Sequence, residues 1–259
     1  MTEASARREL VRYSRQMHAA GWVANHDGNL SARVGDDRIV CTPTSFSKLD
    51  VGLDDLVVVD GDGRKIGGAQ RPFSELVLHR AIYDRRPDAL AVVHAHPPFA
   101  TAFGVSGRAL PHPFLPEAVI SLGADLPTVP LTAPGAPGAE ALAPFVRRCD
   151  AVLIAGNGVL TWGPTLELAY LRCELVEHLC RVAHAAIALG GPQRLPAELT
   201  AELVKKRVAA GLAAPEEGGG RTPDPIERAA AKALAGIPSA DPALVRALTE
   251  QIARTLTTR

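Results

Sequence analysis

Two histidines separated by one residue close the apolar run Ala91-Val92-Val93-His94-Ala95-His96, and a proline pair follows it. The small and β-branched residues predict a strand that ends at the prolines, since proline cannot donate to a β-ladder. Side chains at positions i and i+2 of a strand point to the same side, so His94 and His96 should project together, about 7 Å apart along the strand. Neutral imidazole is the commonest metal ligand in proteins. The strand end therefore predicts either a divalent metal site or a pair of histidines without a ligand.

The composition and charge of the chain argue against several classes of partner. The 259 residues contain 28 Lys and Arg against 28 Asp and Glu, so no net field attracts nucleic acid or an anionic membrane. Aromatic residues make up 4% of the chain, too few to predict a surface that stacks on bases. Residues 1–20 carry four arginines among apolar residues, which matches neither a signal peptide nor an apolar membrane span. The four cysteines lack Cys-x-x-Cys spacing, and we expect reduced, buried thiols in a cytoplasmic protein.

Alternating helix and strand patterns predict an α/β fold. Apolar residues at helical spacing predict helices at residues 4–21, from Ser74 onward, and at 98–103, 139–148 and 165–189. Short apolar runs predict strands at residues 30–34, 38–41, 56–60, 91–96, 126–131, 151–155 and 159–162. Ser74 is the expected N-cap of its helix, because a serine oxygen can accept a free N–H of the first turn. The tight turn Gly156-Asn157-Gly158 separates the last two strands, and its second glycine permits a close backbone approach.

The C-terminal quarter shows a different pattern. Residues 1–195 contain all the predicted strands and are interpreted as one catalytic domain. Further helices are expected at residues 197–210, 225–235 and 242–256. We therefore predict a helical extension over residues 196–259, with a flexible linker near residues 214–224, where proline, glycine and glutamate predominate.

The order of the motifs resembles the class II aldolase/adducin family, whose type member is fuculose-1-phosphate aldolase. The segments that carry the resemblance are Asp27-Gly28-Asn29-Leu30-Ser31, Thr42-Pro43-Thr44, Ser74-Glu75, Val92-Val93-His94-Ala95-His96 and the long helix after the 156–158 turn. They lie in unbroken order within residues 5–195, which is more specific than any single motif. The resemblance implies a three-layer α/β/α sandwich around a mainly antiparallel sheet. It also implies a small-molecule substrate and a homotetramer with active sites at subunit interfaces.

The resemblance also implies a metal site and a catalytic carboxylate. In this family, the two histidines of the His-x-His and a third from an Asn-His-Gly turn bind zinc, and the glutamate of the Ser-Glu pair is the acid/base. His94 and His96 stand at the first two ligand positions. Glu75 stands at the acid/base position, and Asn157 replaces the third histidine. The implied substrate-binding residues are His26, Gly28, Asn29, Thr44, Ser45 and Ser74.

The chain departs from the family pattern around the substrate's anionic end. His26 replaces a hydroxyl residue, and Ser45 replaces a glycine. Phe73 replaces the first serine of a Ser-Ser-Glu, and Leu131 stands where many members carry tyrosine. The substrate is therefore left open as phosphorylated or not.

Several of these residues also have an ordinary structural interpretation. Glu75 could be a first-turn carboxylate favoured by the helix dipole. Asn157 could be a turn residue in the left-handed conformation. His79 and His178, on helices, are expected to be structural. Lys48 and Arg71 are expected to be surface groups.

Three functions fit the pattern. The first is a metal-dependent, aldolase-type carbon–carbon lyase that acts on a hydroxy-carbonyl compound through a metal-stabilised enolate or enediolate. The second is a metal-dependent decarboxylase of a keto acid or a dihydroxyaromatic carboxylate, which passes through the same kind of anion. The third is a non-catalytic, adducin-like module. Zinc is the first choice of metal, and two histidines with one carboxylate also suit manganese, iron or cobalt.

Overall fold

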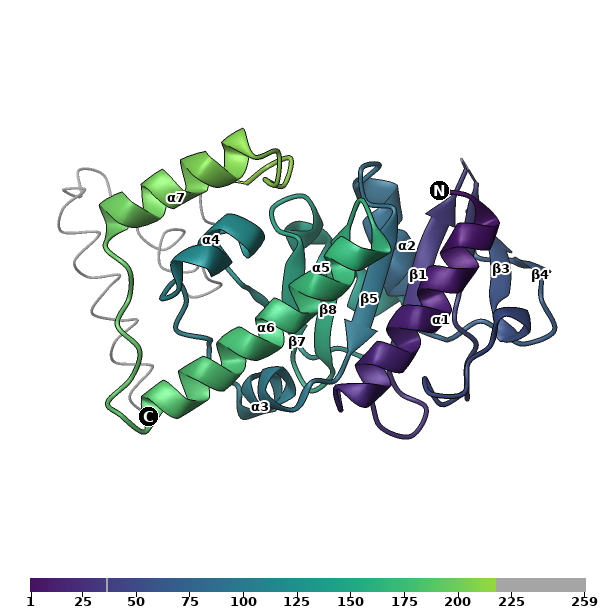
Figure 1. The fold of residues 1–259 in the computed structure, drawn as a ribbon, viewed down its shortest axis with the longest axis horizontal. Helices are drawn as coiled ribbons and strands as arrows, with labels where there is room; N and C mark the ends of the chain where they lie inside the picture. The colour runs from purple at the N-terminus through teal and green to yellow at the C-terminus, as the bar shows by residue number, and fades with distance from the viewer. Residues whose placement is uncertain (36, 218–259) are drawn as a thin grey trace, which may run out of the picture. The chain divides into compact units, whose positions relative to one another are not determined.

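A computed structural model describes residues 1–35 and 37–217, and eight of their strands form one sheet (Figure 1). The spatial order is β4-β3-β2-β1-β5-β8-β7-β6, antiparallel except for the β6–β7 pair. The strands are β1 Asn29–Val34, β2 Arg38–Cys41, β3 Val57–Asp60, β4 Lys65–Gly67, β5 Ala91–Ala95, β6 Thr128–Val129, β7 Ala151–Ile154 and β8 Gly158–Gly163. The helices are α1 Glu3–Ala19, η1 Leu53–Asp55, α2 Leu76–Arg85, α3 Pro98–Ser106, α4 Pro116–Leu122, α5 Ala136–Val146, α6 Leu166–Ile187 and α7 Ala197–Ala209.

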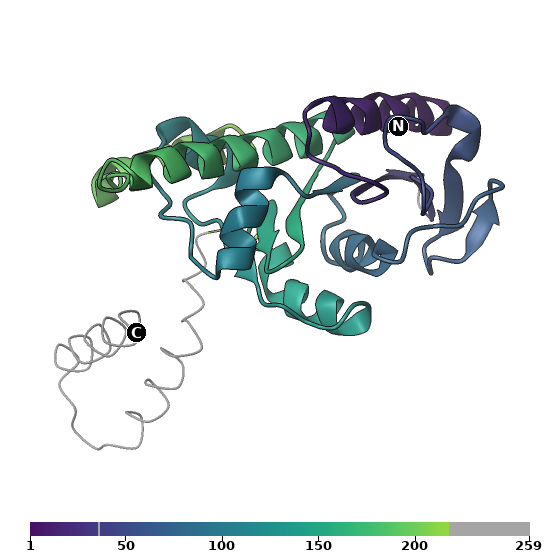
Figure 2. The same ribbon diagram turned by 90° about the horizontal axis from the view of Figure 1, so that it is seen from below.

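Helices cover both faces of the sheet. Figure 2 shows α1 and α6 on one face and α2 and α5 on the other, with the strands between them. The central strands β5 and β8 are buried along their whole length, because side chains of both pleat directions meet a helical layer. One hydrophobic cluster contains Leu10, Val93 and Cys173, and the other contains Val92 and Trp162. The predicted three-layer sandwich with a mainly antiparallel sheet is confirmed.

Side chains cap the starts of α1 and α6. Thr2 Oγ1 accepts the N–H of Ser5 at the start of α1, and Thr165 Oγ1 accepts that of Leu168 at the start of α6. The prediction that Ser74 caps α2 is wrong, because the N-cap residue is Glu75 and its side chain makes no capping bond. The Glu75 carboxylate instead accepts hydrogen bonds from the side chains of Asn29 and Asn157. The short elements α4 and β4 were not predicted, since seven and three residues offer little periodicity to detect.

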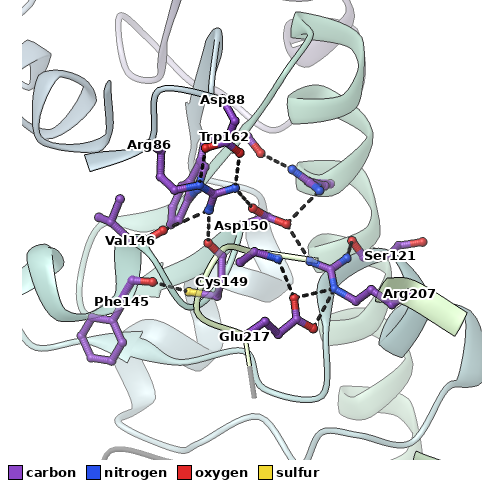
Figure 3. Close-up of polar contacts among 12 residues, drawn as sticks. Arg86, Asp88, Ser121, Phe145, Val146, Cys149, Asp150, Trp162, Arg207 and Glu217 are labelled. Carbon is purple, nitrogen blue, oxygen red and sulfur yellow. Dashed lines mark hydrogen bonds and ion pairs between the residues drawn. The ribbon is translucent and has the colours of Figure 1, made fainter. Parts of the chain in front are cut away.

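The compact unit extends to Glu217, beyond the predicted boundary at residue 195, because α7 docks onto α4 and a buried cluster of charges. Asp150 receives hydrogen bonds from Arg86 over 2.8 Å and from Arg207 of α7 over 2.6 Å (Figure 3). Arg172 of α6 lies 2.8 Å from the same carboxylate. This ion cluster therefore joins the end of α2, the start of β7, α6 and α7.

The predicted linker begins within the described residues and ends outside them. The Glu217 carboxylate accepts hydrogen bonds from Arg207 and from the backbone N–H of Ala214, so residues 214–217 are held in place. Residues 218–224, and the helices predicted at 225–235 and 242–256, lie outside the described residues. All four cysteines are free and buried, as predicted. Among the described helices, none is both long and apolar enough to cross a membrane.

Candidate active site

Sheet register brings the predicted site residues together at the ends of three strands. His94 lies opposite Asn29 of β1 and Leu160 of β8, and its side chain is completely buried. His96 follows the end of β5, the start of α2 supplies Glu75, and the β7–β8 turn supplies Asn157. Four positions that the sequence separates by up to 82 residues thus converge on one point.

Two glycines allow the loops to approach this point. Gly28 has φ +67°, and a Cβ there would lie 2.4 Å from Val23 Cγ1 and 3.1 Å from the His94 carbonyl oxygen. Gly158 has φ +80°, and a Cβ there would lie 2.3 Å from the carbonyl oxygen of Ala95. Side chains are excluded at both positions, as the turn pattern predicted for Gly158.

The partners of the two imidazoles determine their tautomers. His94 Nδ1 lies 2.8 Å from the carbonyl oxygen of Val159, which can only accept, so Nδ1 carries the proton. His96 Nδ1 lies 3.2 Å from Asp27 Oδ2, and an ionised carboxylate also only accepts. Burial, followed by the neighbouring His94, lowers the pKa of His96 and favours the neutral ring. With both rings neutral, both Nε2 atoms therefore carry lone pairs.

These two lone-pair nitrogens face each other over 3.0 Å. Such a contact needs a shared proton or a cation between the two nitrogens, and a tetrahedral zinc ion with bonds of about 2.0–2.1 Å would hold them roughly 3.3 Å apart. Glu75 Oε2 lies 3.4 Å from His94 Nε2 and could complete a set of two imidazoles and one carboxylate. Within residues 1–35 and 37–217, no three His, Cys, Asp or Glu side chains already form a closed metal-binding group. The donor set fits a divalent ion once Glu75 turns toward the histidines.

Glu75 is held by two amide groups. Asn29 Nδ2 donates to Oε2 over 2.9 Å, and Asn157 Nδ2 donates to Oε1 over 2.6 Å. Burial raises the pKa of Glu75, but His94 and these two amide donors outweigh burial and lower the pKa to about 2. The carboxylate is therefore ionised at neutral pH. Asn29 Oδ1 is buried and has no hydrogen-bond partner among the described residues.

The predicted substrate-binding residues differ in their exposure. His26, Ser45 and Ser74 are exposed, Thr44 is half-buried, and Gly28 and Asn29 are buried. Ser45 adopts φ +61°, the left-handed conformation that the glycine of the family pattern would occupy without strain. His79 is buried with its Nδ1 2.7 Å from Ser31 Oγ, which agrees with a structural role.

Two residues that contact the predicted site, Lys48 and Asp27, were not identified from the sequence. Lys48 was predicted at the surface, but its side chain is 1% exposed. Its Nζ donates to the carbonyl oxygens of His26 and Phe46, over 3.4 and 3.0 Å, and so links the two predicted substrate loops. Burial lowers the pKa of Lys48 to about 8, although Asp27 opposes this shift. Asp27 was also missed as the partner of His96, because no spacing in the sequence connects them.

A pocket of about 460 Å³ opens beside Glu75 and Asn157. Its other walls come from α2, α5, residues 129–135 and residues 154–156. A carboxylate and an amide line this mostly apolar pocket, and the carboxylate also lies 3.4 Å from the His94 imidazole, which is an arrangement expected of an active site.

Residues 8–184 match the family described as Class II Aldolase and Adducin N-terminal domain. The chain belongs to this family. A methylthioribulose-1-phosphate dehydratase from Methylococcus capsulatus is 34% identical over 184 residues, which cover 66% of this chain and 89% of that protein. A 3-oxo-tetronate 4-phosphate decarboxylase from Haemophilus influenzae is 32% identical over 187 residues, covering 70% and 88% of the two chains. The solved structure of an L-fuculose 1-phosphate aldolase superposes with a TM-score of 0.74 and 26% identity, covering 80% of this chain and 97% of that one.

The predicted class II aldolase/adducin resemblance is thus confirmed. Its relatives in the family carry out aldol cleavage, decarboxylation and dehydration. Dehydration was not among the reactions that the sequence suggested.

Proposed function

We propose that the protein is a metal-dependent carbon–carbon lyase that acts on a small hydroxy-carbonyl compound. The observation that carries this proposal is the position of Glu75, which lines the pocket and whose carboxylate lies 3.4 Å from His94 Nε2. The nitrogen of His96 lies 3.0 Å from the same His94 atom. A proton-accepting group and a cation site thus adjoin each other, as cleavage beside a carbonyl requires.

His94 and His96 would hold the cation, with Glu75 or Asn157 as a third donor. Zinc is our first choice, and manganese, iron or cobalt also suit this donor set. When bound, the divalent ion supplies positive charge to stabilise the anion that develops on the substrate's oxygen. Asp27 and the Val159 carbonyl keep the two imidazoles in the tautomers that binding needs.

Glu75 would move the proton of the substrate hydroxyl. A carboxylate with a pKa of about 2 is a weak base at neutral pH. Loss of one amide hydrogen bond would raise the pKa of Glu75 and make it a stronger base. Asn157 is the donor that would leave, because it lies in the turn between β7 and β8, whereas Asn29 belongs to strand β1. Asn29 would remain, and its unpartnered Oδ1 could accept a substrate hydroxyl.

Decarboxylation is a second candidate, favoured by the 32% identity to a decarboxylase. Both reactions leave negative charge beside a carbonyl and differ in whether carbon dioxide or a carbonyl fragment departs. The adducin-like alternative explains less, because a module without catalysis has no need for the convergence of Glu75, His94 and His96.

Metal analysis of the purified protein tests the proposal, followed by assays of the zinc-loaded chain against panels of aldol substrates and β-keto acids. We expect one divalent ion per chain, turnover in one panel, and loss of both metal and turnover in His94→Ala. Retained turnover in His94→Ala would overturn the metal mechanism.

We also propose that the protein is a cytoplasmic homotetramer with active sites at subunit interfaces. The family membership supports this proposal. Light scattering of the full chain measures the assembly directly, and a monomeric mass would reject it.

A further inference from the structure

We propose that the pocket beside Glu75 receives an uncharged, apolar substituent of the substrate. The substrate would then be a hydroxy-carbonyl compound with a hydrocarbon or aromatic group on one side of the reacting carbon. This inference rests on the proposed function, because it extends a substrate from the Glu75 carboxylate into the pocket.

The walls of the pocket are mostly aliphatic. Leu142 and Val129 are 1% and 2% exposed and belong to the hydrophobic core, which the pocket thus enters. Val77, Leu78 and Ile154 add further aliphatic surface. A volume of about 460 Å³ accommodates a small organic molecule, and apolar groups leave water favourably for such a surface.

The pocket and the candidate active site share Ser74, Glu75 and Asn157. Glu75 and Asn157 both line the pocket, and their side chains are bonded over 2.6 Å. A molecule whose hydroxyl lies at the Glu75 carboxylate can therefore extend directly between α2 and α5.

The charge of the lining excludes an anionic substituent. Among the residues that the structure describes, no lysine, arginine or histidine lines the pocket, and Glu75 places a negative charge at its edge. A phosphate or carboxylate here would lose its hydration without gaining a positively charged side chain as partner, which is unfavourable. An anionic end of the substrate, if there is one, would have to lie outside this pocket.

Leu131 provides a further apolar surface. Its side chain is 74% exposed although it lines the pocket. A Cβ placed on Gly156 would lie 3.3 Å from Leu131 Cδ1, so the leucine lies against the glycine next to Asn157. An exposed leucine at this place can cover an apolar group that enters beside Asn157, and burial of both surfaces would favour the complex.

Hydroxamates test the inference, because their two oxygens chelate a divalent ion while the remaining group extends from it. Calorimetry with the zinc-loaded full chain would compare acetohydroxamate with benzohydroxamate. If the phenyl group enters the pocket, the larger compound should bind about tenfold tighter or more, from the additional apolar area that it buries. Binding of acetohydroxamate alone, with no gain from the phenyl group, would overturn the pocket assignment and leave the proposed function standing.

Two variants test whether the phenyl group binds in this pocket. Gly138→Leu should remove the gain, because a Cβ at position 138 would point at Leu78 and Thr132, which both line the pocket. Leu131→Asn should reduce the gain several-fold, whereas Leu189→Asn, at an 89% exposed leucine after α6, should not. An unchanged gain in both pocket variants would refute the inference.

A probe without a metal-binding group separates this inference from the proposed function. Benzyl alcohol should bind the metal-free chain, by ligand-observed NMR, and lose binding in Gly138→Leu. If it binds both proteins alike or neither, the inference fails, whatever the metal experiments show. If the neighbouring subunit fills the pocket instead, Leu131→Asn would change the oligomeric mass and benzyl alcohol would not bind.

Discussion

The side-chain amide of Asn157 donates to Glu75 Oε1 over 2.6 Å, across 82 residues of sequence. The residue that stands in the place of a family metal ligand therefore contacts the proposed acid/base. This relationship links the two properties that the site needs, a third metal donor and a base of suitable strength.

Asn157→His should strengthen metal binding, because an imidazole would add a third nitrogen beside His94 and His96. We expect a gain of about tenfold, or roughly 1.4 kcal/mol. Competition with a chromophoric chelator measures it, with the wild-type chain as reference. Unchanged turnover would show that position 157 only adjusts the metal affinity, whereas loss of turnover would show that the asparagine itself contacts substrate. No gain in metal affinity would place Asn157 outside the coordination shell.

Asp27→Asn should weaken metal binding by about 10–100-fold, because it removes the negative charge that holds His96 Nδ1–H. An asparagine oxygen can still accept the Ala24 N–H, now bonded to Asp27 Oδ1 over 2.6 Å, so the loop should stay folded. Asp62→Asn, at a 64% exposed surface carboxylate, is the control. Equal metal affinity in Asp27→Asn and the control would contradict a positioning role.

Lys48→Met should stabilise the fold at neutral pH more than at high pH. Burial lowers the pKa of Lys48 from 10.5 to about 8, so below pH 8 the folded chain retains a buried charge that costs stability. This cost falls as pH rises from 8 to 10.5. Lys48 is already neutral in the folded chain above pH 8, and it becomes neutral in the unfolded chain only near pH 10.5. The free-energy difference between variant and wild type should therefore fall by about 3 kcal/mol across this window. Urea unfolding at pH 7 and pH 10.5 measures it, and a pH-independent difference would contradict the assignment.

Asp150→Ala should destabilise the protein by about 3–5 kcal/mol, since Arg86, Arg172 and Arg207 would lose their shared buried carboxylate. The exposed ion pair of Arg147 with Glu216 gives the contrast. Arg147→Ala should cost less than about 1 kcal/mol, because solvent screens that pair. Thermal or urea unfolding compares them, and similar losses in the two variants would show that the buried cluster contributes little.

The boundaries of the main elements were predictable because they depend on local patterns. The helix over residues 165–189 was observed as Leu166–Ile187, and the strand over 56–60 as Val57–Asp60. The strand predicted at 126–131 shortened to Thr128–Val129, since only these residues find a partner in β7. An apolar run predicts strand conformation, but the length of a strand depends on the ladder that its neighbour offers.

The sequence by itself determined that His94 and His96 share one strand end and that a glutamate begins a nearby helix, because spacing along one element sets which side chains project together. Only the tertiary structure decided that Asp27 orients His96, that Asn157 binds Glu75, and that Lys48 is buried. These contacts depend on sheet register and on loop paths that join residues far apart in the chain. Local periodicity contains no information about such distances, which are set by the packing of the whole domain.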